Sequence, residues 1–220
     1  MSFTVCHVKH SSLFAIVDGN NFFVSCERIF NPSLNNKPVI VLSNNDGCAI
    51  ACSNEAKALG IAMAAPLHTF SHLIKQHGIK IFSSNFELYG DISNRMMTIL
   101  RTFTPDVEVY SIDEAFIDLS HHPLTDVNIM AKTMYDTVLK YIGIPITIGI
   151  APTKTLAKVA NRMAKKQRTT YMILKTHEEI NTALKATEIG SIWGVGRSLT
   201  PKLRKQGIYT AYDLSIKDPR

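Results

Sequence analysis

The sequence lacks several features that would assign it to common protein classes. No apolar run reaches the length of a membrane-spanning helix, and residues 1–12 lack the apolar core of a signal peptide. Cysteine is scarce, and its closest pair has no second pair or histidine at a zinc-finger distance. We therefore expect a soluble cytoplasmic protein without structural zinc, with reduced thiols at its four cysteines: Cys6, Cys26, Cys48 and Cys52.

Internal repeats and low-complexity segments are also absent, and charge of one sign is unevenly distributed. The 220 residues are 45% hydrophobic, enough for one sizeable core and a small second domain. Residues 151–220 carry 14 of the 24 Lys and Arg but 5 of the 18 Asp and Glu. A basic C-terminal third favours contact with a polyanion, although a solvated basic surface would give the same composition.

The stretch over 107–119 places two adjacent carboxylates between two apolar runs of β type. Consecutive side chains of a strand face opposite sides, so Asp113 and Glu114 can serve one site only where one strand turns into the next. We expect them at the lip of a hairpin, pointing outward together. Two like charges held so close require a cation, and oxygen ligands suit Mg²⁺.

A third carboxylate strengthens this interpretation. An isolated Asp-Glu pair is usually two solvated turn residues, but the apolar run over 13–17 reads as a buried strand that ends on Asp18. Three carboxylates at two strand ends make a metal site plausible.

The order of elements predicts an α+β fold. A strand ending at Asp18 precedes a helix to Phe30 that Asn20 could cap. Residues 31–82 read as a small inserted lobe with strands at 38–42, 48–52 and 79–82. Helices near 91–100, 125–142 and 153–166 then alternate with the hairpin and with strands at 144–150 and 171–174. This segregation is close to a split βαβ or ferredoxin-like plan.

The C-terminal segment carries a Gly-x-Gly turn, Gly194 to Gly196, followed by a basic helix. Such a turn lets backbone N–H groups approach a phosphate closely, and cationic side chains surround it here: Arg197, Lys202, Arg204 and Lys205. We expect this segment to bind a nucleic-acid backbone without reading its sequence; the alternative is a plain helical turn.

Together these motifs resemble a known family. Asp18 at a strand end, 20–23 (NNFF), 110–116 (YSIDEAF), 149–158 (GIAPTKTLAK) and the Gly194–Gly196 turn are similar to the Y-family translesion DNA polymerases. Residues 42–48 (LSNNDGC) and 82–89 (FSSNFELY) look most like its UmuC branch, the catalytic subunits of bacterial SOS mutagenic polymerases. The resemblance covers about residues 13–220.

The resemblance implies a right-hand polymerase in a bacterial cytoplasm. Its palm would be residues 1–21 and 83–174, its fingers 22–82, and its incomplete thumb, with a helix-hairpin-helix, 175–220. The family's little finger would be missing. Implied partners are primer–template DNA, a deoxynucleoside triphosphate and, by resemblance alone, a UmuD-like dimer, a RecA filament and a sliding clamp.

The resemblance also implies roles for single residues. Asp18, Asp113 and Glu114, with the Gly19 carbonyl, would bind two Mg²⁺ ions for nucleotidyl transfer. Phe23 matches the steric gate against a 2′-hydroxyl, although a core Phe would look the same. Three side chains match or neighbour triphosphate contacts, although solvated helix residues would look the same: Lys57, Lys165 and Asn54. Lys154 is a weaker addition.

Departures from the family leave alternatives open. The family often has Tyr-Glu-Ala-Arg where residues 54–57 read NEAK, which predicts a weaker hold on the triphosphate. Gly19 replaces a bulkier residue. The competing hypotheses are a truncated, catalytically weak DNA-binding fragment of such a polymerase and another palm enzyme such as a nucleotide cyclase. The basic Gly-x-Gly segment argues against the cyclase.

Overall fold

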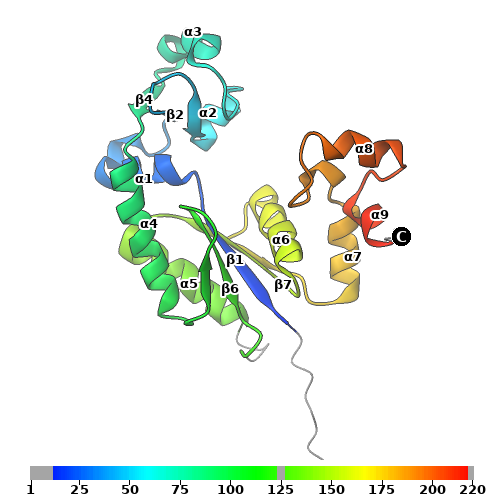
Figure 1. The fold of residues 1–220 in the computed structure, drawn as a ribbon. Helices are drawn as coiled ribbons and strands as arrows, with labels where there is room; N and C mark the ends of the chain where they lie inside the picture. Colours follow the sequence, from blue (N-terminus) through cyan, green and yellow to red (C-terminus); the bar gives the residue numbers. More distant parts are fainter. Residues whose placement is uncertain (1–11, 123–126, 218–220) are drawn as a thin grey trace, which may run out of the picture.

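The structure is a computed structural model that describes residues 12–122 and 127–217, and it contains two β-sheets (Figure 1). The larger sheet has the strand order β5-β6-β1-β7-β8. Its strands are β1 (Phe14–Gly19), β5 (Val107–Val109), β6 (Glu114–Asp118), β7 (Ile146–Ala151) and β8 (Tyr171–Ile173). The strand predicted to end at Asp18 continues by one residue to Gly19.

The topology of the larger sheet confirms the predicted α+β, ferredoxin-like plan. Strand β1 lies between β6 and β7 and runs antiparallel to both, while β8 extends the edge parallel to β7. Helices α4 (Phe86–Arg101) and α5 (Val127–Ile142) pack together on one face of the sheet, and both supply side chains to the main core. The helix predicted over 125–142 is therefore present from 127 onward; residues 125 and 126 lie outside the described part.

Alternation along β1 assigns its two faces to different helices. Ala15 and Val17 belong to the main core with α4 and α5, whereas Ile16 packs in a second cluster with α6 (Lys154–Gln167). Asp18 follows Ile16 by two residues and so shares the α6 face. This register explains why the lysines of α6 reach the carboxylates at the end of β1 and the start of β6.

Helix α6 approaches the sheet closely at Gly149. A Cβ atom built on Gly149 would lie 2.2 Å from the carbonyl oxygen of Ala157 and 2.2 Å from the backbone nitrogen of Asn161. The Asn161 amide donates a buried hydrogen bond to the Thr147 carbonyl at 2.7 Å. Only glycine allows this contact, which seats α6 over β7 and β1.

The smaller sheet has the order β3-β2-β4 and forms an inserted lobe between α1 (Phe22–Phe30) and α4 (Figure 1). Its three strands match the predicted ones to within one residue: β2 (Val39–Leu42), β3 (Ala49–Cys52) and β4 (Lys80–Ser83). The lobe also contains the turn η1 (Pro32–Leu34) and the helices α2 (Asn54–Ala58) and α3 (Leu67–His77). Ile40 and Leu42 face a core within the lobe, whereas Val39 and Val41 join the main core. The lobe is therefore packed onto the main body rather than merely tethered to it.

The start of α1 differs from the prediction that Asn20 caps it. The N-cap residue is Asn21, in a left-handed conformation with φ of 47°, and no side-chain capping bond forms. The Asn20 side chain instead accepts a hydrogen bond from the Thr147 hydroxyl at 2.8 Å, across 127 residues of sequence. Sequence spacing suggested a local role for a side chain that makes a long-range contact.

The C-terminal segment lies on the α6 side of the sheet (Figure 1). It contains α7 (His177–Lys185), the 3-10 turn η2 (Ile189–Ser191), α8 (Leu199–Lys205) and α9 (Ala211–Ser215). Gly194 has φ of 90°, so the first position of the Gly-x-Gly turn requires glycine. The basic helix predicted after the turn is present as α8.

The described residues include three free cysteines, of which Cys26 and Cys52 are buried and Cys48 is half-buried. Cys6 lies outside the described part of the chain. Across residues 12–122 and 127–217, the longest apolar helical stretches fall short of what crossing a bilayer would require.

Candidate active site

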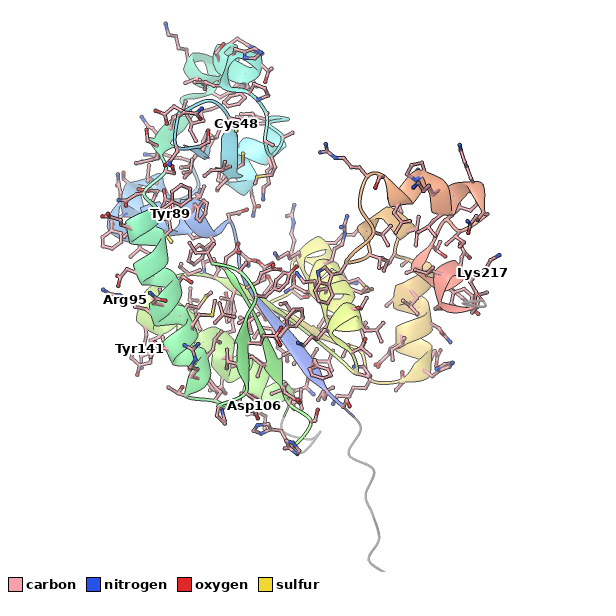
Figure 2. All side chains as sticks on the ribbon, viewed as in Figure 1. Cys48, Tyr89, Arg95, Asp106, Tyr141 and Lys217 are labelled. Carbon is pink, nitrogen blue, oxygen red and sulfur yellow. The ribbon has the colours of Figure 1, made fainter. Side chains whose placement is uncertain are left out.

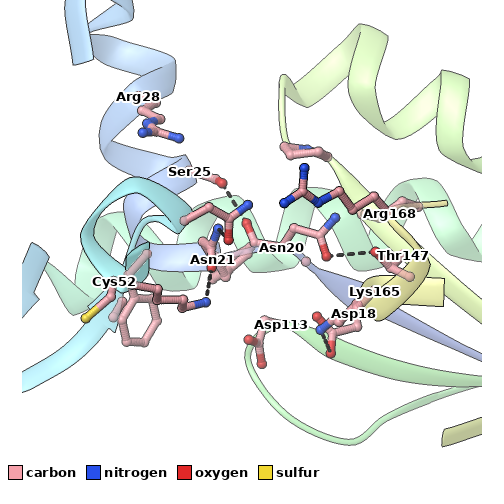
Figure 3. Close-up of a pocket in the computed structure, with 18 of the residues that line it drawn as sticks. Asp18, Asn20, Asn21, Ser25, Arg28, Cys52, Asp113, Thr147, Lys165 and Arg168 are labelled. Carbon is pink, nitrogen blue, oxygen red and sulfur yellow. Dashed lines mark hydrogen bonds and ion pairs between the residues drawn. The ribbon is translucent and has the colours of Figure 1, made fainter. Parts of the chain in front are cut away.

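A cavity of about 1080 Å³ opens where the inserted lobe meets the end of β1 (Figure 3). Strand β1, the turn after it, α1, β3, α2 and the C-terminal end of α6 contribute to its wall. Seven of the predicted site residues line it together: Asp18, Gly19, Phe23, Asn54, Lys57, Asp113 and Lys165. Segments separated by more than a hundred residues therefore meet at one opening.

Asp18 lies at the base of this cavity with 14% of its side chain exposed. Its pKa is raised to about 6: burial is the largest cause, Lys165 opposes the rise, and the neighbouring carboxylates Glu114 and Asp113 add to it. The Lys165 Nζ atom lies 2.6 Å from the Asp18 Oδ2 atom (Figure 3). One lysine thus compensates only part of the cost of a buried carboxylate beside two others.

Asp113 and Glu114 lie at the beginning of β6, as the hairpin prediction required, but their side chains have different partners. Asp113 precedes the strand, lines the cavity and accepts a hydrogen bond from the Ser111 hydroxyl at 2.6 Å. Glu114 pairs with Asp18 across the strands and accepts from the Lys158 Nζ atom at 2.9 Å. Asp113 therefore faces the cavity, whereas the Glu114 side chain is held by Lys158 of α6.

The donor chemistry of this cluster fits a hard cation. Carboxylate oxygens and the Gly19 carbonyl are ligands that Mg²⁺ prefers, and the raised pKa of Asp18 marks a place where positive charge would be stabilising. In the described ranges, no three acidic, histidine or cysteine side chains converge closely enough to hold an ion as they stand. The ammonium groups of Lys165 and Lys158 instead lie against the Asp18 and Glu114 carboxylates and supply the positive charge that stabilises them.

A second polar group forms the opposite wall. The Lys57 Nζ atom donates to the Asn21 side chain at 2.5 Å, and the Asn21 amide donates to Asn54 at 3.1 Å. Burial lowers the pKa of Lys57, and the charge of Lys165 nearby lowers it further. Two lysines from different elements therefore face one space, which is an arrangement suited to an anion.

Two further residues of the cavity were not anticipated from the sequence. Thr147 lies on β7 beside Asn20, and Arg168 ends α6 in a left-handed conformation with φ of 58° (Figure 3). Neither carries a motif of its own. Asn21 was also missed, because its role depends on a left-handed backbone that places its amide between Asn54 and Lys57.

Phe23 forms part of the cavity wall. It is half-buried, and its ring stacks on that of Tyr89 with centroids 4.4 Å apart and an interplanar angle of 14°. Tyr89 lies near the start of α4, below the inserted lobe (Figure 2). Phe23 therefore borders the cavity, and its role as a steric gate stays a prediction.

The residues predicted to bind the DNA backbone lie outside the cavity. Gly194, Gly196, Arg197 and Lys202 belong to the C-terminal segment and do not line it. This segment is connected to the site through Lys158, whose ammonium lies 4.4 Å from the Tyr110 ring centroid and 5.7 Å from that of Trp193.

Comparison with known proteins assigns the family. The model of the impB/mucB/samB family matches residues 17–162, which include every carboxylate of the site. The chain belongs to this family. The resemblance to Y-family DNA polymerases predicted from the motifs is thereby confirmed.

Curated relatives of this impB/mucB/samB chain include polymerases by name. It is 47% identical to Protein UmuC of Salmonella typhimurium over 92% of this chain and 49% of that one. It is 33% identical to DNA polymerase IV 1 of Bacillus subtilis, again over 92% of this chain and 49% of that one. The chain thus spans about half the length of the curated relatives it matches.

Solved structures agree with the family assignment. DinB from Sulfolobus solfataricus superposes with a TM-score of 0.81 at 25% identity, over 94% of this chain and 60% of that one. A Dbh ternary complex superposes with a TM-score of 0.80 at 26% identity, with the same coverage. The α+β fold of this chain is therefore that of the catalytic core in Y-family polymerases.

Proposed function

We propose that this chain is the catalytic region of a translesion DNA polymerase that extends a primer by two-metal nucleotidyl transfer. A primer 3′-hydroxyl would attack the α-phosphorus of the incoming nucleotide, and pyrophosphate would leave. One observation carries the proposal: a single cavity presents the carboxylates Asp18 and Asp113 on one wall and the lysines Lys57 and Lys165 around the same space. Such a cavity suits a metal-bound triphosphate.

The carboxylate side of the cavity would hold the metal. Asp18, Asp113 and Glu114, with the Gly19 carbonyl, would be the ligands of two Mg²⁺ ions, which would supply positive charge to the attacking and leaving oxygens. For this, the Lys158 and Lys165 ammonium groups must leave the carboxylates they now contact. Lys165 is 40% exposed, so its side chain can turn toward a bound phosphate instead.

The opposite side would hold the nucleotide. Lys57 and Asn54, bridged by Asn21, would contact the triphosphate together with Lys165. Phe23 would lie against the sugar and exclude a 2′-hydroxyl. Since β3 lines the cavity with small or medium side chains, Ile50, Ala51 and Cys52, the surface above the nascent base pair would be small, which supports tolerance of damaged templates.

We further propose the predicted division into palm (1–21 and 83–174), fingers (22–82) and thumb (175–220). The thumb would hold primer–template DNA through Gly194, Gly196, Arg197 and Lys202. The protein partners implied by resemblance, a UmuD-like dimer, a RecA filament and a sliding clamp, belong to the same proposal.

The second candidate is a DNA-binding fragment with negligible turnover. It is favoured by one observation: Lys158 and Lys165 already pair with the Glu114 and Asp18 carboxylates, whereas Arg197 and Lys202 are exposed. In this case the basic C-terminal segment would bind DNA, and each lost phosphate contact would lower the salt dependence of binding by about one unit of slope. Arg197→Ala and Lys202→Ala should show that reduction, and Lys132→Ala on α5 should not.

Single-nucleotide primer extension with Mg²⁺ separates the candidates. The wild type is compared with the Asp113→Asn/Glu114→Gln double variant and with Glu87→Gln/Asp91→Asn, which removes two exposed charges from α4. Extension by the wild type and the control, lost in the double variant, would support the polymerase. No extension by any of them, with salt-sensitive DNA binding retained, would support the DNA-binding fragment.

A further inference from the structure

The Phe23 ring has a second layer behind it, contributed by a different helix. Tyr89 of α4 is fully buried and stacks beneath Phe23. Its hydroxyl donates to the Glu27 carboxylate at 2.7 Å. Phe23 and Glu27 are four residues apart on α1, so they lie on the same helix face.

Tyr89 is therefore fixed at two points along α1. Its ring contacts Phe23, and its hydroxyl contacts the residue one turn further on. Phe86, one turn earlier on α4, meets the edges of both rings, with centroids 5.8 Å from Phe23 and 6.2 Å from Tyr89. Phe23 consequently has the cavity on one side and a packed aromatic group on the other.

This arrangement limits where the Phe23 ring can go. A ring that borders a cavity can discriminate between ligands that differ by one hydroxyl only if it does not retreat from the larger one. Protein interiors are close-packed, so retreat would require Tyr89 to move, and its hydrogen bond to Glu27 opposes that movement.

We propose that Tyr89 is the positioning residue that sets discrimination against a 2′-hydroxyl, by holding the Phe23 ring fixed through the stack and the Glu27 hydrogen bond. The inference rests on the proposed function, in which Phe23 lies against the nucleotide sugar. Tyr89 itself touches no substrate, because its side chain is buried behind Phe23.

Three variants test the proposal. Tyr89→Leu removes the stacked ring, and Tyr89→Phe keeps the ring while losing the hydroxyl. Leu100→Ala is the control for general destabilisation, because Leu100 is also fully buried on α4 but lies about 16 Å further along the helix axis. Each is compared with the wild type in incorporation of dATP and of ATP opposite a template thymine.

The selectivity for dATP over ATP should fall roughly 2- to 10-fold in Tyr89→Leu, the range that loss of one aromatic pair allows. Tyr89→Phe keeps the stack and loses only the hydrogen bond to Glu27, so its selectivity should fall less, to within about twofold of the wild type. Leu100→Ala should keep the wild-type ratio even if its absolute rate falls. Wild-type selectivity in Tyr89→Leu, or an equal fall in Leu100→Ala, would overturn the proposal.

A second readout separates this inference from the proposed function. With 4-fluorophenylalanine at position 23, the ¹⁹F resonance of the folded chain should be displaced by the stacked Tyr89 ring. The displacement should persist in Tyr89→Phe and Leu100→Ala and be lost in Tyr89→Leu. Titrating this resonance with dATP and ATP on a chain-terminated primer–template gives the affinity ratio without turnover. Failure of the wild type to incorporate dATP would count against the polymerase alone, whereas an unchanged resonance and ratio in Tyr89→Leu would refute the role of Tyr89.

Discussion

The indole nitrogen of Trp193 donates a hydrogen bond to the Tyr110 hydroxyl at 2.9 Å, across 83 residues of sequence. The two rings meet edge to face, with centroids 5.5 Å apart. Lys158 lies against both rings while it pairs with Glu114. The C-terminal segment is thus joined to the sheet at Tyr110, close in sequence to Asp113 and Glu114, which we propose to be catalytic.

Breaking this contact should release the C-terminal segment from the sheet. Trp193 is the single tryptophan of the chain, so its fluorescence reports this junction directly. We expect Tyr110→Ala to shift the emission to longer wavelength, to increase quenching by acrylamide and to cost about 1–2 kcal/mol of stability. Tyr141→Ala, at a side chain of α5 that is 70% exposed, should leave the emission unchanged, and an unshifted spectrum in Tyr110→Ala would contradict the junction.

The close approach of α6 to β7 predicts an intolerant glycine. Gly149→Ala should destabilise the fold by about 3 kcal/mol, because the new methyl group would overlap the backbone of α6 at three atoms. Gly90→Ala is the matched control: it lies within α4, where a Cβ meets nothing within 4 Å, and should stabilise by about 0.5–1 kcal/mol. Urea denaturation of both variants measures the change in stability. Equal changes in the two variants would show that α6 moves to accommodate the new methyl group.

Glu55 should make stability depend on pH. Although burial opposes this, hydrogen bonds from the backbone N–H of Glu55 itself, from the Ser53 hydroxyl and from the Arg28 guanidinium hold the pKa of Glu55 below its ordinary 4.5. A lowered carboxyl pKa contributes stability that is present above the unfolded-state value and is lost as pH falls through the folded-state value. Glu55→Gln should therefore cost about 0.5–1 kcal/mol at pH 7, and this difference should vanish well below pH 4.5. A difference that persists in acid would rule out the ion pair as its cause.

Magnesium should stabilise the folded chain through the carboxylate cluster. At ten times its dissociation constant, a cation that binds only the folded state adds about 1.4 kcal/mol. We expect thermal denaturation in Mg²⁺ rather than in EDTA to show this gain for the wild type and for Asp136→Asn, an exposed residue of α5, but not for Asp18→Asn. An equal gain in Asp18→Asn would place the ion elsewhere.

Much of this architecture could be predicted because it depends on local patterns. The apolar run before Asp18 and the apolar runs on either side of Asp113 and Glu114 predicted the strands and their ends, and the helix predicted over 153–166 is present as α6. The family motifs then predicted that residues far apart in the sequence meet at one site. Of those, seven share one cavity.

What the sequence did not predict depends on contacts over long separations. The stacking of Tyr89 on Phe23 joins residues 66 positions apart; both lie in family motifs, but neither motif indicates that the two rings meet. Glu114 turns toward Lys158 because β6 and α6 face each other, which follows only from the sheet register. Asn20 was assigned to the helix by proximity, although its partner is Thr147.

The central position of β1 also has a consequence during synthesis. It emerges from the ribosome early, yet its two partners, β6 and β7, come much later, and about 130 residues separate its end from the end of β7. At the usual pace of translation, this apolar strand waits roughly 7 to 26 s without its neighbours. The nascent chain therefore exposes this segment for longer than a protein whose first strands pair with each other.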